Sequence, residues 1–289
     1  MTMTTLTALN RLLRLPLALM VACTALAGAM AWHAPLPGLT WWALGWGVFL
    51  LAAASSVLNQ VQERAADALM RRTCRRPLAC GALSPRAGTM IGLVLASGGL
   101  APLTIGTGPG PAMLGLAALA WYLAVYTPLK RYSSLAVLAG TPCGAIPPLM
   151  GWLAAGGPFP DPQPLALALF MFLWQVPHYW LLALPDRDEL RTAGFRVLPA
   201  MSDRQLLAVS HRWILGLALA TLLLPALSLP VTPLLQGVLA GLALALAITS
   251  SWFWHRSLFA VDTSRRLRRL LSLYLASIIL VLFIEALCR

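Results

Sequence analysis

The sequence predicts an all-α membrane protein that crosses the bilayer about nine times, in one domain covering residues 1–289. Only 10% of the residues are charged and 59% are hydrophobic, whereas a water-soluble domain has about 25% charged residues. The apolar residues lie in blocks of roughly 20, the length of helix that crosses a ~30 Å hydrocarbon core. Barrel strands are ~10 residues long and alternate in polarity. Helices are therefore the spanning structure that fits.

The predicted spans follow one another along the whole chain. In order, they cover residues 15–32, 41–58, 88–104, 111–127, 134–154, 163–184, 209–228, 232–254 and 270–288. The first span also has features of a secretory signal, because Arg11 and Arg14 precede an apolar stretch that ends in small residues. We take it as the first helix, since it is long enough to span and further spans follow it.

The basic residues test this count independently. With the N-terminus inside, 20 of the 21 Lys and Arg residues fall on inner segments, and only Arg289 falls outside. This asymmetry follows the positive-inside rule, and a miscounted span would scramble it. The net charge of +12 is thus explained by topology and anionic headgroups, and not by nucleic acid. We expect a multi-pass protein of the bacterial inner membrane, with its N-terminus and its active face in the cytoplasm.

Two long polar loops are predicted on the inner face, at 59–87 and 185–208. In the first, Asn59, Glu63 and Asp67 are spaced i, i+4 and i+8, so they share one face if the helix continues. Carboxylate and amide oxygens are hard ligands that suit Mg²⁺, particularly when substrate phosphates complete the coordination. The alternative is a solvated loop whose acids only pair with neighbouring arginines.

The second loop holds another acidic cluster, formed by Asp186, Asp188 and Glu189 and followed by Arg191 and Arg196. Five of the nine acidic residues of the chain lie in the two clusters, and this concentration favours a functional role. Two carboxylate clusters that face each other can hold Mg²⁺ on a diphosphate while arginines neutralise the remaining charge. That arrangement favours ionisation of a phosphate ester leaving group.

Four segments of the chain resemble the intramembrane prenyltransferases of the UbiA superfamily, and within it the protoheme IX farnesyltransferase (heme O synthase) family. They are Asn59 to Pro85, Tyr126 to Arg131 (YTPLKR), Gly144 to Trp152 (GAIPPLMGW) and Leu173 to Trp180 (LWQVPHYW). The first segment indicates only the superfamily, and the last two narrow it. The chain departs from the usual pattern at four places: Glu63 where Asp is common, Ala65-Ala66 where further acids are usual, Glu189-Leu190 where Asp-Tyr is usual, and Arg196 where proline is usual.

The resemblance implies helices around a central cavity and a Mg²⁺-dependent prenyl transfer. Farnesyl diphosphate would donate its farnesyl group to the 2-vinyl group of heme b, and water would complete the substituent of heme O. The implied metal ligands are Asn59, Glu63, Asp67, Asp186, Asp188 and Glu189, and all of these except Asp186 are also implied to be catalytic. The implied diphosphate-binding residues are Arg72, Arg76, Lys130 and Arg131. From the resemblance we also expect an association with proteins of terminal-oxidase assembly or heme A synthesis.

His178 is the candidate contact to heme, as an axial ligand or a propionate partner. It lies about two turns from the inner end of the sixth span, and polar groups at such a depth usually face the interior of the bundle. The alternative for His178 is a bond to a helix carbonyl. Two alternatives for the whole protein stay open: a superfamily member with another acceptor, such as an aromatic quinone precursor or a chlorin, and a transporter or heme-handling carrier.

Overall fold

A computed structural model describes residues 5–32, 37–226, 232–256 and 260–287, and these residues contain helices and no strands. The helices are α1 (Thr5–Leu13), α2 (Leu15–Met30), α3 (Gly38–Ala68), α4 (Pro85–Thr107), α5 (Pro109–Trp121), the π-helix η1 (Tyr122–Tyr126), α6 (Thr127–Leu129), α7 (Ala136–Ala154), α8 (Pro162–Ala183), the 3₁₀ helix η2 (Leu184–Asp186), α9 (Arg187–Thr192), α10 (Asp203–Ala226), α11 (Pro233–His255) and α12 (Ala260–Leu287). The prediction of an all-α fold is confirmed.

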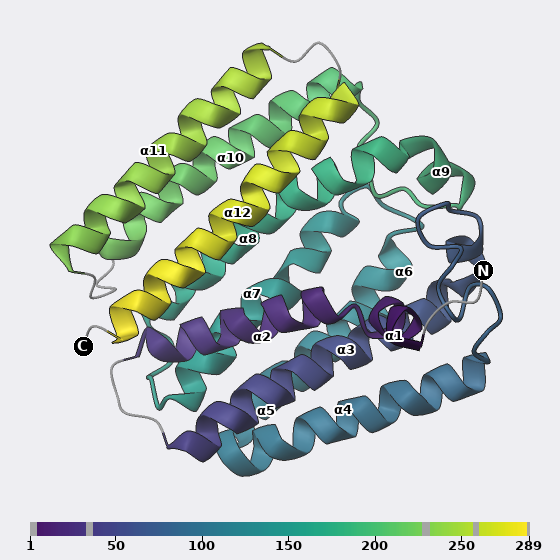
Figure 1. The fold of residues 1–289 in the computed structure, drawn as a ribbon, viewed down its shortest axis with the longest axis horizontal. Coiled ribbons are helices and arrows are strands. Elements are labelled where there is room, and N and C mark those ends of the chain that lie inside the picture. The colour runs from purple at the N-terminus through teal and green to yellow at the C-terminus, as the bar shows by residue number, and fades with distance from the viewer. Residues whose placement is uncertain (1–4, 33–36, 227–231, 257–259, 288–289) are drawn as a thin grey trace.

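The number of spans agrees with the prediction once the first span is read as a broken one. Among the described residues, eight helical stretches are long and apolar enough to cross a membrane, and the bent pair α1–α2 brings the number to nine. Helix α2 has 16 residues, which at 1.5 Å per residue is shorter than the ~30 Å hydrocarbon core. The start of α1 and the end of α12 lie on opposite sides of the bundle, as an odd number of crossings requires (Figure 1).

Both predicted inner loops are partly helical. Helix α3 continues to Ala68 and α4 begins at Pro85, so only residues 69–84 connect them. The cause is local, because the residues after position 60 include Gln, Glu, Arg and Ala, which are good helix formers. The change to polar residues therefore shows where α3 leaves the hydrocarbon, and the helix itself ends further along the chain. Within 185–208, η2, α9 and the first turns of α10 leave short connections.

The last helix also begins earlier than predicted. Helix α12 starts at Ala260 and not at 270, because the arginine-rich segment before its apolar part is helical as well. Parts of two predicted spans, residues 227–228 and 288, lie outside the described residues.

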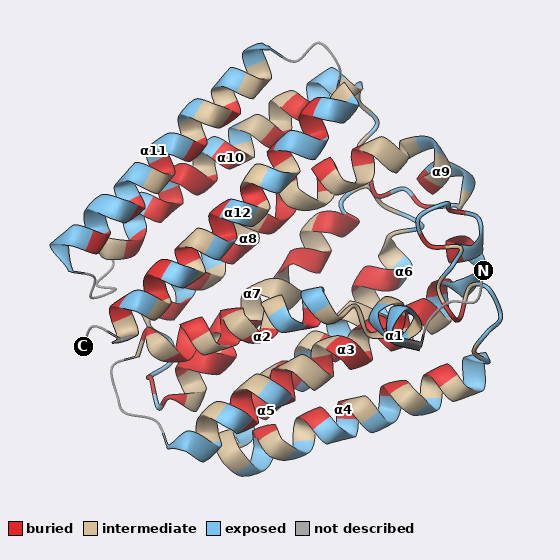
Figure 2. Cartoon of the chain, in the orientation of Figure 1, coloured by how far each residue is buried: buried red, intermediate tan, exposed pale blue. Residues whose placement is uncertain are grey.

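Two buried clusters hold the bundle together. One unites α8, α10, α11 and α12 with parts of α2 and α7, and the other unites α2 to α5 with α7. Buried residues concentrate along α3 and α7, whereas α4 and α11 expose long apolar faces, as expected for lipid-facing helices (Figure 2). Small residues bring α2 and α7 into close contact: a Cβ atom at Gly151 would overlap the Ala25 carbonyl, and one at Gly28 would overlap that of Pro148.

Candidate functional site

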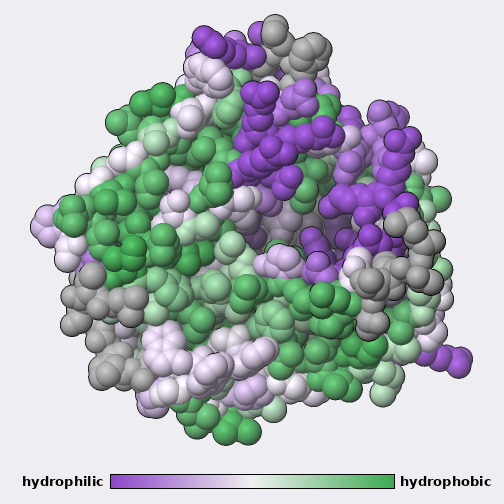
Figure 3. Space-filling view, viewed as in Figure 1, coloured by the Kyte–Doolittle hydropathy of each residue, from purple (hydrophilic) through white to green (hydrophobic). Residues whose placement is uncertain are grey.

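A cavity of about 280 Å³ opens within the polar end of the bundle. Its walls come from α2, α3, α5, η1, α7 and α8, with Leu275 from α12, and the segments around residues 70–76 and 195–197 lie at its polar end. Hydrophilic side chains gather around a hollow at this end, and the faces beside it are apolar (Figure 3). The cavity is therefore amphiphilic, with a charged end and an apolar body formed by residues such as Leu17, Met20, Val48 and Leu51.

The acidic face of α3 forms one wall of the charged end. Asn59, Glu63 and Asp67 are 4%, 6% and 3% exposed, and all three line the cavity. Their i, i+4, i+8 spacing aligns them because α3 continues through all three positions. Of the two predicted arrangements, the shared helix face is the one observed, and these acids do not lie on a solvated loop.

Each acid of this face is paired with a buried cation. Lys130 Nζ lies 2.6 Å from Glu63 Oε1, and Arg76 donates from one terminal nitrogen to Asp67 Oδ2 at 2.7 Å. The pKa of Lys130 is lowered by burial, and the charge of Glu63 acts in the opposite direction. These short pairs lie in a partly dry site, where charges interact far more strongly than on the surface.

A hydrogen-bond chain orients Asn59. The Thr127 hydroxyl donates to the Tyr122 carbonyl at 2.8 Å and accepts from Asn59 Nδ2 at 3.1 Å. The same Tyr122 carbonyl also accepts the backbone N–H of Thr127, a π-type bond at the end of η1, and such local irregularities are common at functional sites. Since the amide nitrogen of Asn59 is used in this way, its Oδ1 remains as an acceptor at the cavity wall.

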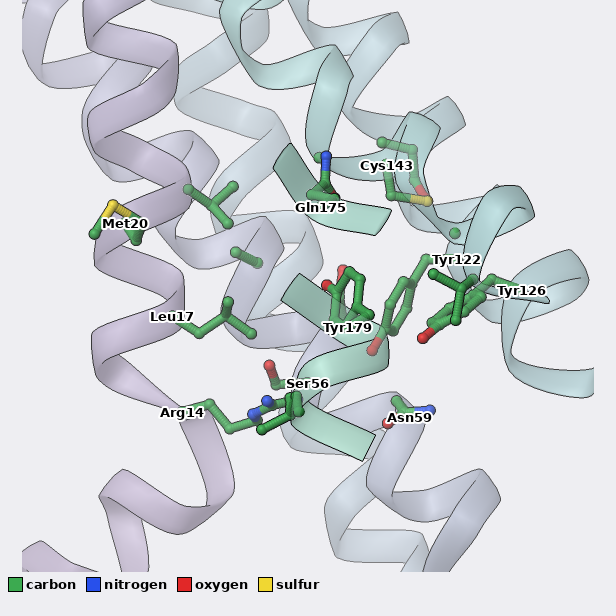
Figure 4. A pocket seen from close by; sticks show the side chains of 18 of the residues that line it. Arg14, Leu17, Met20, Ser56, Asn59, Tyr122, Tyr126, Cys143, Gln175 and Tyr179 are labelled. Carbon is green, nitrogen blue, oxygen red and sulfur yellow. The ribbon is translucent and has the colours of Figure 1, made fainter. Parts of the chain in front are cut away.

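Two of the motif segments meet inside the membrane. Gln175 on α8 donates to the carbonyls of Met171 and Thr141, at 2.9 and 3.2 Å. Its carboxamide lies against Gly144 on α7, where an added Cβ would overlap it. The glycine is thus required by a close approach between the two helices, and both residues line the cavity (Figure 4).

The second acidic cluster faces the arginines that follow α3. The Asp186 carboxylate lies 3.1 Å from Arg72 Nε, and Glu189 pairs with Arg71 Nε at 3.3 Å and accepts from the Arg71 backbone N–H at 2.9 Å. Neither acid lines the cavity, although Arg72 does. The pKa of Arg72 is lowered by burial and raised by Asp186. The two loops therefore meet as predicted, but through acid–arginine pairs and not through two facing carboxylate clusters.

Three other predicted site residues lie outside the cavity lining. Asp188 and Arg131 are exposed. His178 is partly buried on the side of α8 that faces α12, where its ring stacks on Trp174 with a centroid distance of 4.4 Å. His178 lies on α8, but a sequence pattern does not fix the direction of its side chain around the helix axis.

Arg14 is a cavity residue that sequence reasoning missed. It joins α1 to α2 with φ 53° and ψ 52°, a left-handed conformation that is uncommon for a non-glycine residue. Gln60 on α3 supports the 50° bend by donating to the Leu12 carbonyl at 2.7 Å. The Arg14 side chain points across the cavity toward Ser56 (Figure 4). Because the positive-inside pattern already explained an arginine here, nothing in the sequence marked it out.

Three tyrosines also line the cavity without having been predicted. Tyr122, Tyr126 and Tyr179 lie together on one side of it (Figure 4). Lys130 Nζ is 4.7 Å from the centroid of the Tyr126 ring, within the range of a cation–π contact. The sequence could have indicated two of them, because Tyr122 and Tyr126 are one helical turn apart and Tyr126 begins the YTPLKR segment. The chain has only five tyrosines.

The donor set at the α3 wall fits Mg²⁺. Asn59, Glu63 and Asp67 present amide and carboxylate oxygens at one wall, and Mg²⁺ prefers such hard donors. Within the described parts of the chain, no three His, Cys, Asp or Glu side chains converge into a metal site by themselves. Mg²⁺ usually binds proteins through one or two carboxylates and completes its coordination with water and substrate phosphates.

The fold and the cavity define a multi-pass helical membrane protein with an amphiphilic site at one end of its bundle. The sequence pattern of the UbiA prenyltransferase family matches residues 19–283. The chain belongs to this family and is a prenyltransferase.

Among known proteins, two protoheme IX farnesyltransferases are similar to this chain over 70% or more of its length. A protoheme IX farnesyltransferase of Nitratidesulfovibrio vulgaris (strain DP4) is 35% identical over 280 residues, which cover 96% of this chain and 94% of the relative. One of Geobacter sulfurreducens is 46% identical over 205 residues, which cover 70% and 76%.

Solved structures support the fold. A UbiA homolog from Aeropyrum pernix K1 superposes with a TM-score of 0.70 at 21% identity, covering 91% of this chain and 98% of that one. A UbiA homolog from Archaeoglobus fulgidus bound to DMAPP and Mg²⁺ has a TM-score of 0.69 at 14% identity, with 95% and 99% covered.

Proposed function

We propose that this prenyltransferase transfers the farnesyl group of farnesyl diphosphate to heme b. One heme b, one farnesyl diphosphate and one water would give one heme O and one diphosphate. The relatives at 35–46% identity are named protoheme IX farnesyltransferases, and the DMAPP and Mg²⁺ of the Archaeoglobus protein are the same classes of donor and metal.

The single observation that carries the proposal is the composition of the cavity. Its charged end combines two buried acids, Glu63 and Asp67, with four cations, Arg14, Arg72, Arg76 and Lys130. This excess of positive charge complements a diphosphate, and arginine binds phosphate oxygens through parallel hydrogen bonds. The apolar body beside it suits a prenyl chain and keeps out the water that would quench a carbocation.

Each wall would then have a distinct task. Asn59, Glu63 and Asp67 would hold Mg²⁺, which when bound stabilises negative charge on the departing diphosphate. The four cations would bind that diphosphate and retain it. The faces of Tyr122, Tyr126 and Tyr179 would stabilise positive charge on the allylic carbons through their ring quadrupoles. Asp186 and Glu189 would position Arg72 and Arg71; their role as metal ligands, and that of Asp188, stays a prediction.

We also propose that the charged end faces the cytoplasm of a bacterial inner membrane, since 20 of 21 basic residues gather on that side in the nine-span topology. Arg131 as a diphosphate contact, His178 as a heme contact, and the association with oxidase-assembly or heme A synthesis proteins stay predictions.

The test is a competition between acceptors. Purified protein is given farnesyl diphosphate and Mg²⁺ with heme b, with an aromatic quinone precursor, or with a chlorin, and the products are separated by chromatography and weighed by mass spectrometry. Farnesylated heme that forms only with Mg²⁺ supports the proposal. Turnover of another acceptor, with none of heme b, would assign the protein to a different reaction within its family.

A further inference from the structure

His178 lies beside α12 at a defined register. Trp174 Nε1 on α8 donates to the Leu271 carbonyl on α12 at 2.8 Å. The two helices are the sixth and ninth spans and run in opposite directions. Toward the charged end, residue numbers therefore increase along α8 and decrease along α12, by three or four for each turn. One turn in this direction brings His178 opposite Arg268.

Both side chains have unused bonding capacity. His178 Nδ1 is buried and has no hydrogen-bond partner among the described residues. Arg268 is partly buried, and no carboxylate of the described parts of the chain lies within 4.0 Å of its guanidinium nitrogens. A buried polar atom and a partly desolvated cation left without partners are costly, and together they indicate a missing polar ligand.

Arg268 differs in this respect from its neighbours on α12. Arg265, Arg266 and Arg269 are exposed at the same end of the helix, where arginines meet anionic headgroups. Arg268 is partly buried instead, and the nearby contact between α8 and α12 borders the cavity, since Trp174 and Leu275 both line it. A ligand held between His178 and Arg268 would therefore lie beside the chamber of the diphosphate and not inside it.

We infer that the edge between α8 and α12 binds the prenyl acceptor, with Arg268 paired to an acceptor carboxylate and His178 in contact with its macrocycle. The inference rests on the proposed function, because heme b supplies both a metal-centred ring and propionate carboxylates. Trp174, stacked on His178, adds a flat apolar surface beside them. Arg268 would thus contribute to acceptor binding without contacting the prenyl diphosphate.

The experiment compares heme b with its dimethyl ester, in which both propionates are methylated. The full chain is assayed in lipid nanodiscs as wild type, Arg268→Gln, Arg268→Lys and the exposed control Arg269→Gln. Binding is followed by the heme absorbance spectrum without farnesyl diphosphate, and KM is then measured for each substrate. Arg268→Gln should weaken heme b binding about 10-fold, the effect of one charge-assisted hydrogen bond. It should leave binding of the ester and the KM for farnesyl diphosphate unchanged, and Arg268→Lys should recover part of the loss.

Several outcomes would overturn the inference. Equal weakening of heme b and its ester would indicate a packing role for Arg268, and an equal effect of Arg269→Gln would indicate general attraction to headgroups or anions. No heme binding by the wild type would also overturn it. Failure of the proposed function looks different: the wild type would bind heme b through Arg268 yet form no farnesylated product.

Discussion

Lys130 Nζ lies 2.6 Å from Glu63 Oε1, with both side chains almost completely buried. The pair connects the segment after α6 to the acidic face of α3 and puts a cation beside a carboxylate at the cavity wall. Such a pair is costly to break, because either partner alone would be a buried, uncompensated charge. Burial lowers the pKa of Lys130 and the charge of Glu63 opposes that shift, so the charge state of Lys130 depends on how completely the pair is shielded from water.

The first prediction concerns this pH dependence. Because burial lowers the pKa of Lys130 from its ordinary 10.5, its ammonium form is lost at lower pH than that of a free lysine. The kcat/KM for farnesyl diphosphate should therefore fall on the alkaline side below pH 10.5. Lys130→Arg, which keeps its charge, should move that fall to higher pH. Identical alkaline limbs in both proteins would show that another group titrates.

The second prediction concerns the bond that orients Asn59. Thr127→Val removes the hydroxyl between Asn59 Nδ2 and the Tyr122 carbonyl, so the Asn59 amide loses its fixed direction. The Mg²⁺ concentration for half-maximal activity should rise about 5- to 20-fold, which corresponds to roughly 1–2 kcal/mol. Thr127→Ser keeps the hydroxyl and should behave like the wild type. A rise of the same size in the serine variant would rule out the hydroxyl as the cause.

The third prediction concerns the close approach of α7 and α8. Gly144→Ala puts a methyl group into the Gln175 carboxamide and should destabilise the protein by about 1–3 kcal/mol, as overpacking does. Thermal unfolding in detergent measures the loss. Gly98→Ala is the control, since its nearest neighbour would be 3.8 Å away. Gln175→Ala in the same chain should recover part of the stability, and strict additivity of the two changes would contradict the contact.

The fourth prediction separates two arginines. Arg14 lines the cavity, whereas Arg131 is exposed and does not. Arg14→Gln should raise the KM for farnesyl diphosphate about 10-fold or more, as expected for a lost charged contact to phosphate. Arg131→Gln should change it less than about threefold. The reverse order of effects would restore the role that the sequence pattern suggested for Arg131.

The number of spans was predictable because the length of the apolar blocks reports on it directly. The acidic face of α3 was also predictable, since helical spacing alone aligns Asn59, Glu63 and Asp67. Contacts between distant segments could not be predicted, because no local rule indicates that Asp186 contacts Arg72 or that Gln175 contacts Gly144. The position of Arg14 in the cavity could not be predicted for another reason. The bend at Arg14 is supported by a hydrogen bond from Gln60, which lies on another helix.

The most direct measurement of heme farnesylation by this chain is the heme O content of membranes that lack any other heme-farnesylating protein. It is determined by chromatography and mass spectrometry after expression of the wild type or of Asp67→Asn at equal membrane levels. The wild type should accumulate heme O, and the variant should make at least about 100-fold less, because it loses a proposed metal ligand and the partner of Arg76. Wild-type membranes without heme O, or equal amounts from both proteins, would contradict the account.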